Sequence, residues 1–132
     1  MKIQKKMQLL FILGAIIDGM IAVSWFLIAS GWNIPNILNG YVGDGPGYRL
    51  AMYIGAMFMA GWTVILGWGA LKPIERRDLL IITSAFLTFS VIFEFLFFKT
   101  ILGGSVFMFG VAKRLIISIS FAVAWFYSLK YK

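Results

Sequence analysis

Four long apolar segments dominate the pattern of hydrophobic and polar positions along the chain. They cover residues 7–30, 50–71, 79–98 and 107–129. Each is long enough to cross a hydrocarbon layer about 30 Å thick, which requires about 20 mostly apolar residues in a helix. None shows the alternation of apolar and polar residues that is typical of a membrane β-strand. The pattern therefore predicts an all-α integral membrane protein, an antiparallel bundle of four transmembrane helices forming a single domain over residues 1–132.

The connections between these segments differ in length and composition. Residues 31–48, GWNIPNILNGYVGDGPGY, are rich in Gly, Asn and Pro, which favour turns. We expect this long loop to be either an ordered cap over the mouth of the bundle or a lid that contacts a ligand. Residues 72–78, KPIERRD, predict a tight turn, because Pro73 stops one helix and Asp78 suits the positive end of the next.

The stretch that leads into the fourth segment has several interpretations. Residues 99–113 contain Gly103, Gly104 and Gly110, and glycine weakens a helix. A helix with an irregular start, a re-entrant segment and an interfacial loop are all compatible with this composition.

The positive charges favour one orientation in a membrane. If both termini lie on the same side, eight of the 12 Lys and Arg residues fall on that side. These are Lys2, Lys5, Lys6, Lys72, Arg76, Arg77, Lys130 and Lys132. Because cytoplasmic loops carry an excess of Lys and Arg, we expect cytoplasmic termini in a multi-pass protein of the cell (plasma) membrane. Glu75, Arg76 and Arg77 are interpreted as a solvated charge cluster.

The composition excludes several classes of domain and of functional site. Hydrophobic residues make up 61% of the chain and charged residues 13%, which leaves no room for a soluble domain. The absence of Cys and His excludes disulfides, Cys/His zinc sites, His-ligated haem and nucleophiles activated by His, and we expect no cofactor. The net charge of +7 sits at segment ends, so we expect the lipid bilayer and its anionic headgroups as partners, and no nucleic acid.

Glu94 stands out because it interrupts the apolar run FSVIFEFLFFK. A charged side chain at the bilayer centre costs about 2.5–3.5 kcal/mol on insertion scales, so it should be paired, neutral or in a wet cavity. At ~1.5 Å per residue, Glu94 and Arg114 both lie about 22 Å from the cytoplasmic ends of their helices. The matching depth predicts that Glu94 pairs with Arg114 in preference to Lys113, through two parallel hydrogen bonds to the guanidinium.

Asp18 lies near the middle of the first segment, on a stripe with the small residues Gly14 and Ala22. Small residues let helices approach closely in membranes, so this stripe should face the bundle and carry Asp18 inward. No basic residue is obviously at its depth, although the long side chain of Arg114 reaches in that direction. Burial without a partner favours the neutral carboxyl, which donates a hydrogen bond. The hydroxyls at hand are those of Thr83, Ser90 and Ser118.

Two interpretations of these polar residues remain open. In one they form a ligand- or ion-binding pocket, because ionisable residues within a membrane are functional candidates. Its candidate residues are Asp18, Glu94, Arg114, Ser90, Ser118 and Trp25. Trp62 and Trp125 are further candidates for an aromatic wall. In the other interpretation, the same residues only fix which helix packs against which.

Three functions are compatible with this pattern. The first is binding or transport of a small cationic or amphipathic ligand or ion, in a homo-oligomer if a conducting path is needed. The second is an accessory subunit that packs within a larger membrane complex. The third is an enzyme that uses Asp18 and Glu94 as acid and base, which the lack of His, Cys and an acidic metal motif disfavours.

Overall fold

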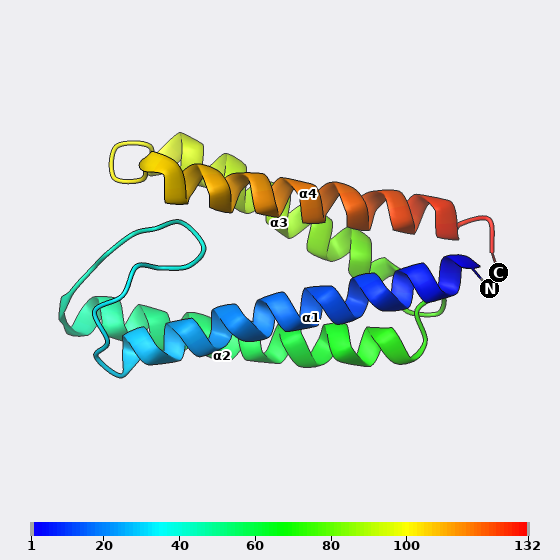
Figure 1. The fold of residues 1–132 in the computed structure, drawn as a ribbon, viewed down its shortest axis with the longest axis horizontal. Coiled ribbons are helices and arrows are strands. Elements are labelled where there is room, and N and C mark those ends of the chain that lie inside the picture. The colour runs from blue at the N-terminus through cyan, green and yellow to red at the C-terminus, as the bar shows by residue number, and fades with distance from the viewer. Residues whose placement is uncertain (1, 132) are drawn as a thin grey trace.

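The computed structural model describes residues 2–131, and over that range the chain is helical with no strand. Four helices follow one another: α1 (Lys2–Ala29), α2 (Gly45–Leu71), α3 (Asp78–Phe97) and α4 (Gly104–Ser128) (Figure 1). All four are long and apolar enough to cross a membrane. The predicted all-helical architecture of four such segments is therefore confirmed.

The helices α1, α2 and α4 begin several residues earlier than the apolar segments predicted. Polar and small residues continue each helix beyond its apolar part, as Lys2–Lys6 do in α1. At the start of α2, Gly45 adopts a positive φ of 80° and Pro46 occupies the first turn, where its missing N–H needs no partner. Hydrophobicity alone does not reveal such helix starts.

The stretch after α3 also resolves into regular structure. A short turn follows Phe97, and α4 begins at Gly104, whose φ of 81° lies in the region that favours glycine. From there the helix is continuous to Ser128. Of the three interpretations of residues 99–113, a helix with an irregular start is therefore the one that the structure supports.

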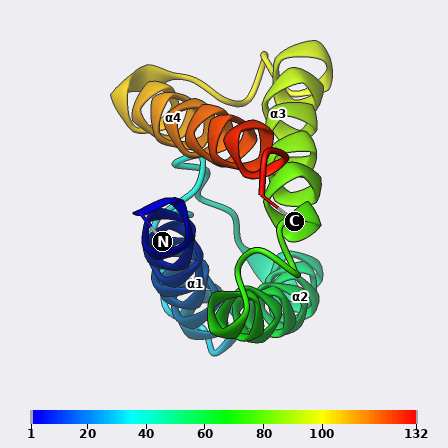
Figure 2. The same cartoon turned by 90° about the vertical axis from the view of Figure 1, so that its right-hand side faces the viewer.

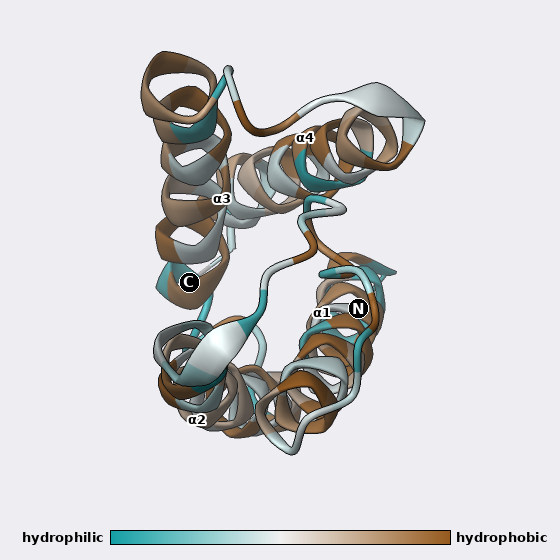
Figure 3. Cartoon of the chain, turned by 90° about the vertical axis from the view of Figure 1, so that its left-hand side faces the viewer, coloured by the Kyte–Doolittle hydropathy of each residue, from teal (hydrophilic) through white to brown (hydrophobic). Residues whose placement is uncertain are grey.

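The helices form two antiparallel hairpins that face each other. α1 packs along α2, α3 packs along α4, and α1 also meets α4, whereas the backbones of α2 and α3 hardly approach each other. Figure 2, a view along the helices, shows the two hairpins on opposite sides of the molecule. Hydrophobic residues run along all four helices (Figure 3). In Figure 1 both termini lie at one end, here the termini end, and the loop between α1 and α2 lies at the other, here the loop end.

The main core lies toward the termini end. Met7, Phe11, Leu66, Leu80 and Phe121 are its large buried side chains, drawn from all four helices. Two glycines make this packing close, because a Cβ on Gly69 would meet the Phe11 ring and a Cβ on Gly14 would meet Phe121. The five large core side chains fill the space between the hairpins at this end. A smaller cluster of Val91, Leu102, Phe107 and Val111 joins α3 to α4 near the loop end.

The arginines near the helix ends bind backbone carbonyls. The guanidinium of Arg77 donates to the carbonyl oxygen of Ser128, the last residue of α4 (3.0 Å), and to that of Tyr131 beyond it (2.8 Å). Arg76 donates to the carbonyl of Trp68 and lies 3.5 Å from the centroid of its ring. Cations are favourable at helix C-termini. Arg76 and Arg77 are half-buried, so the prediction of a solvated cluster describes only part of these two side chains. Glu75 forms an exposed ion pair with Lys72.

Asp78 begins α3, as the sequence predicted. Its carboxylate accepts a hydrogen bond of 2.9 Å from the indole N–H of Trp125 in α4. Together with Arg77, this contact ties the start of α3 to the end of α4. Polar contacts of Arg77 and Asp78, the two residues at the start of α3, thus fix the hairpin of α3 and α4 at the termini end.

Candidate intramembrane site

A cavity of about 410 Å³ lies between the two hairpins. Its volume falls within the range of about 300–1,000 Å³ that is typical of small-molecule sites. All four helices contribute to its wall, and the loop between α1 and α2 contributes Leu38. The apolar part of the wall includes Ile17, Ile21, Phe58, Met59, Trp62, Phe86, Leu87, Ile117 and Phe121. The wall of the cavity is therefore mainly apolar.

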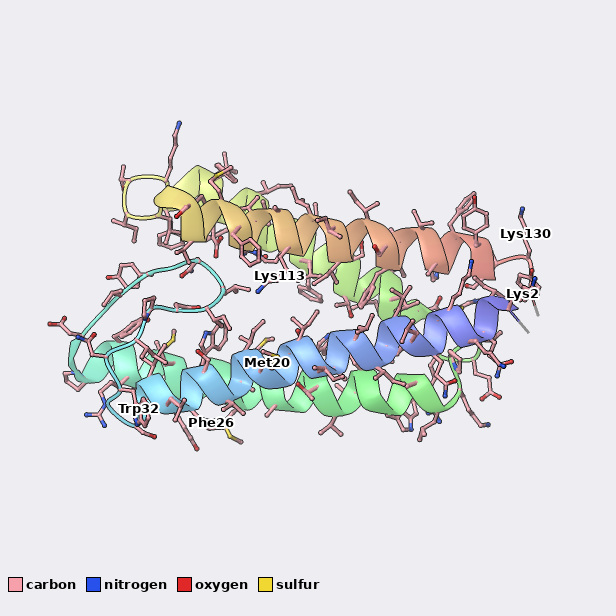
Figure 4. The ribbon with its side chains drawn as sticks, in the orientation of Figure 1. Lys2, Met20, Phe26, Trp32, Lys113 and Lys130 are labelled. Atoms are coloured by element: carbon pink, nitrogen blue, oxygen red, sulfur yellow. The ribbon has the colours of Figure 1, made fainter. Side chains whose placement is uncertain are left out.

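Two side chains of opposite charge, Asp18 and Lys113, line this cavity. Asp18 comes from α1 and Lys113 from α4, and both are partly buried. Among residues 2–131 neither makes a side-chain hydrogen bond or an ion pair within 4.0 Å, although each lies within the electrostatic reach of the other. Figure 4 shows Lys113 pointing from α4 into the space between α4 and α1. The cavity thus contains two charged groups without a direct partner.

The sequence analysis identified Asp18 but did not recognise that Lys113 lies at a similar depth. The positions of the two residues along their helices contain this information. Asp18 lies about 16 Å from the loop end of α1, and Lys113 lies about 14 Å from the loop end of α4, at ~1.5 Å per residue. Because α1 and α4 pack against each other, this similar depth brings the two residues to one level.

The predicted pair of Glu94 and Arg114 is confirmed. The Nη2 of Arg114 donates to Oε2 of Glu94 over 2.6 Å. Arg114 also donates from Nη1 to the hydroxyl of Ser90 and from Nε to the carbonyl of Gly110, both over 3.2 Å. The guanidinium is only 2% exposed, so these bonds satisfy a charge that is almost fully buried.

The predicted geometry of two parallel hydrogen bonds is wrong for this pair. Only Oε2 of Glu94 accepts from Arg114, and Oε1 accepts from the amide Nδ2 of Asn39 over 3.4 Å. Asn39 belongs to the loop between α1 and α2. The carboxylate therefore links three parts of the chain, α3, α4 and the loop. No local pattern predicts the contact of Asn39 with Glu94, because it joins a loop to a helix far along the chain.

The loop between α1 and α2 is an ordered cap at the loop end, and Asn36 is its centre. The Asn36 side chain is 4% exposed, and its Oδ1 accepts from the indole of Trp25 (3.0 Å) and the backbone N–H of Leu38 (2.9 Å). Its backbone N–H donates to the carbonyl of Tyr41, and its carbonyl accepts from the N–H of Gly40. These bonds fold the loop back on itself and tie it to α1.

The tip of this cap rests on α4. A Cβ on Gly110 would overlap the backbone carbonyl of Leu38, and a Cβ on Gly40 would lie 2.9 Å from the Val106 side chain. Leu38 is also part of the cavity wall. The loop is therefore an ordered cap that contributes Leu38 to the cavity wall, while its action as a lid over a ligand stays a prediction.

The remaining predicted site residues are divided between the cavity and other contacts. Ser90 and Arg114 line the cavity, and Glu94 does not. Ser118 lies outside the wall, where its hydroxyl meets those of Ser84 and Thr88, both over 2.8 Å. These hydroxyls join α3 to α4 within the hairpin. The predicted acid and base, Asp18 and Glu94, therefore do not share one chamber.

The tryptophans are divided in the same way. Trp62 lines the cavity, and its indole N–H donates to the hydroxyl of Thr83 over 3.2 Å, which joins α2 to α3. Trp25 lies outside the cavity wall, where it bonds to Asn36 and covers Gly55 of α2. Of the three tryptophans considered as aromatic walls, Trp62 alone takes that place.

Comparison of the chain with protein-family models, with curated proteins and with solved structures gives no match. Its function is therefore argued from the cavity. Arg114, Glu94 and Ser90 satisfy one another and act as a clamp between α3 and α4. Asp18 and Lys113 are ionisable side chains without a direct partner in a mainly apolar chamber, where they can bind the polar part of a molecule whose remainder is apolar.

Proposed function

We propose that the chain is a multi-pass membrane protein that binds a small amphipathic molecule in the cavity between its two helical hairpins. Asp18 and Lys113 hold the polar group of the ligand, and the apolar wall holds the rest. The observation that carries the proposal is the presence of these two charged side chains, each without a direct partner, in a mainly apolar cavity of about 410 Å³.

A charged side chain within a membrane is energetically costly. Each charged group near the bilayer centre costs about 2.5–3.5 kcal/mol on insertion scales. Glu94 and Arg114 offset this cost by a direct contact of 2.6 Å, whereas Asp18 and Lys113 make no such contact with each other. A ligand that pairs with both groups would offset the cost for them. Binding is therefore a better explanation of Asp18 and Lys113 than helix packing is.

The proposal includes an orientation. With the termini in the cytoplasm, as the distribution of Lys and Arg favours, the loop end and its cap face outward across the cell membrane. The cap then separates the cavity from the outer water. Binding in this position is also the first step that transport of the same ligand would need, and release outward would require the Asn39–Glu94 contact to open.

Native mass spectrometry of the chain, released gently from its own membrane, tests the proposal. The expected result is a retained small molecule that is absent from the Asp18→Asn and Lys113→Gln variants. Asp44→Asn is the matched control, because Asp44 is an exposed acid in the loop between α1 and α2. Retention that is equal in all three variants, or absent from the unaltered chain, would contradict the proposal.

A second function, that of an accessory subunit, is favoured by the weak contact between α2 and α3. A helix of a partner protein could fill that side of the bundle. The same mass measurement separates the two functions. A larger protein attached to a chain without a small molecule would support the accessory subunit, and a ligand bound to the chain alone would support the binding protein.

A further inference from the structure

The cavity is closed at both of its ends. At the loop end the cap covers it, with Leu38 in the wall and Asn36 holding the loop in place. At the termini end the main core fills the space between the hairpins, and Phe11, Leu66 and Phe121 are each no more than 2% exposed. A molecule that reaches the cavity along the helix axes would have to displace one of these two structures.

The side between α2 and α3 is different. Phe58 of α2 and Phe86 of α3 both line the cavity, and yet they are 77% and 66% exposed. A side chain that belongs to a cavity wall and is also largely exposed marks the place where the cavity meets the outer surface. The two helices hardly approach each other here. Phe58 and Phe86 therefore flank a lateral opening.

The position of this opening follows from the bond between Trp62 and Thr83. Their side chains join α2 to α3 over 3.2 Å. Phe58 lies about one turn from Trp62 toward the loop end, and Phe86 lies about one turn from Thr83 in the same direction. α3 starts beside the end of α2 and moves away from it toward the loop end (Figure 1). The opening therefore lies on the loop-end side of the Trp62–Thr83 bond.

We propose that the ligand is a single-chain zwitterionic amphiphile that enters from the surrounding membrane through the opening between Phe58 and Phe86. Its ammonium group meets Asp18, its anionic group meets Lys113, and its hydrocarbon chain lies between the two phenylalanines. This proposal rests on the proposed function and adds the class of ligand and its route.

Charge complementarity selects the zwitterion. A ligand with only a positive charge would be attracted by Asp18 and repelled by Lys113, and a ligand with only a negative charge would meet the reverse. A zwitterion satisfies both groups and adds no net charge to an apolar chamber. The apolar flanks of the opening exclude a free ion as the occupant and suit a hydrocarbon chain that continues into the bilayer.

The route is tested by blocking the opening in a chain that contains no cysteine of its own. Phe58→Cys is labelled with a bulky maleimide, and Phe86→Cys serves as a second blocking variant. Val64→Cys with the same label is the matched control, because Val64 lies on α2, is 70% exposed and does not line the cavity. All three positions are exposed, so the substitutions leave the core intact.

The probe is lysophosphatidylcholine, added to the chain in a neutral maltoside detergent, and native mass spectrometry follows the one-to-one adduct with time. We expect the label at either phenylalanine position to slow adduct formation by about tenfold or more and the control label to leave the rate unchanged. An alkyl sulfate and an alkyl trimethylammonium of the same chain length should be retained at least about thirtyfold less well.

The outcomes distinguish the route from the function. If the adduct forms at the same rate in the blocked and control proteins, the lateral route is wrong, while binding stands. If the singly charged amphiphiles are retained as well as the zwitterion, the ligand class is wrong. If no amphiphile is retained by the unaltered chain, both this inference and the proposed function are overturned.

Discussion

Arg114 and Glu94 join α4 to α3 through one contact of 2.6 Å in the apolar interior. The guanidinium uses its other groups on Ser90 and on the carbonyl of Gly110, and the carboxylate uses its other oxygen on Asn39 of the loop. This ion pair therefore connects the hairpin of α3 and α4 to the cap over the cavity. This relationship distinguishes the paired charges of Arg114 and Glu94 from Asp18 and Lys113, which line the cavity without a direct partner.

The first prediction concerns the energy of this pair. Arg114→Gln should lower the free energy of unfolding by about 3–5 kcal/mol, because it leaves the Glu94 carboxylate buried without its partner. The double variant with Glu94→Gln should lose less than the sum of the two single variants. A double-mutant cycle, measured by unfolding in mixed micelles, gives the coupling, which we expect at about 1–3 kcal/mol.

The exposed pair of Lys72 and Glu75 provides the matched control for that cycle. Its atoms are 3.0 Å apart, but the side chains are 56% and 65% exposed. Lys72→Gln and Glu75→Gln should therefore couple by less than about 0.5 kcal/mol. A coupling at Glu94 and Arg114 as small as that of the control would show that the buried pair is not a clamp.

The second prediction concerns the contact between the cap and α4. Gly110→Ala places a methyl group where the carbonyl oxygen of Leu38 lies, so the loop must move away from the helix. The backbone amides of Asn36 and Gly40, which donate within the loop, should then exchange their hydrogens faster. Hydrogen exchange followed by mass spectrometry or NMR measures this change.

Gly67→Ala is the control for the Gly110 variant. Gly67 lies on α2, and a Cβ there meets nothing within 4 Å. This change should leave the exchange of the loop amides as it is and stabilise the helix slightly, since alanine favours a helix more than glycine does. Equal protection of the loop in both variants would mean that the cap does not depend on its contact with α4.

The third prediction concerns Asn36 as the centre of the cap. Asn36→Ala removes the acceptor of the Trp25 indole and of the Leu38 N–H, and we expect a loss of about 1–3 kcal/mol of stability. Asn33→Ala, at an exposed position of the same loop, should change stability by less than about 0.5 kcal/mol. Thermal unfolding of the two variants measures this difference, and similar losses of stability would refute the role of Asn36.

The sequence predicted the helices well because each apolar segment carries its own signal. A run of about 20 apolar residues predicts a helix without any knowledge of its neighbours. The pairing of Glu94 with Arg114 was also predictable, since depth along two antiparallel helices is a matter of counting. In both cases the information is local or follows from the order of the helices alone.

The contacts that hold the cap and the charged residues that line the cavity were not predictable in the same way. The roles of Asn36 and Asn39 depend on how an irregular loop folds back between the hairpins, and no periodicity in GWNIPNILNGYVGDGPGY encodes that path. Lys113 was considered only as a partner for Glu94, although its depth matches that of Asp18. The direction of a side chain decides between neighbouring residues such as Lys113 and Arg114, and this direction follows from the packing of α4 against two helices.

The central claim is that an amphiphile occupies the cavity beside Asp18, and contacts to isoleucine methyl groups test it most directly. Ile17, Ile21 and Ile117 line the cavity, whereas Ile16 and Ile119 are 54% and 62% exposed and do not. The chain is prepared with labelled isoleucine methyl groups in a deuterated maltoside detergent and receives protonated lysophosphatidylcholine. Nuclear Overhauser effects then report which methyl groups the amphiphile touches.

The account predicts contacts from the amphiphile to the three cavity isoleucines, and predicts that Asp18→Asn abolishes them. Contacts to Ile16 and Ile119, which come from the surrounding micelle, should be the same in both proteins. Contacts that are confined to the exposed isoleucines, or cavity contacts that are unchanged in Asp18→Asn, would contradict the claim.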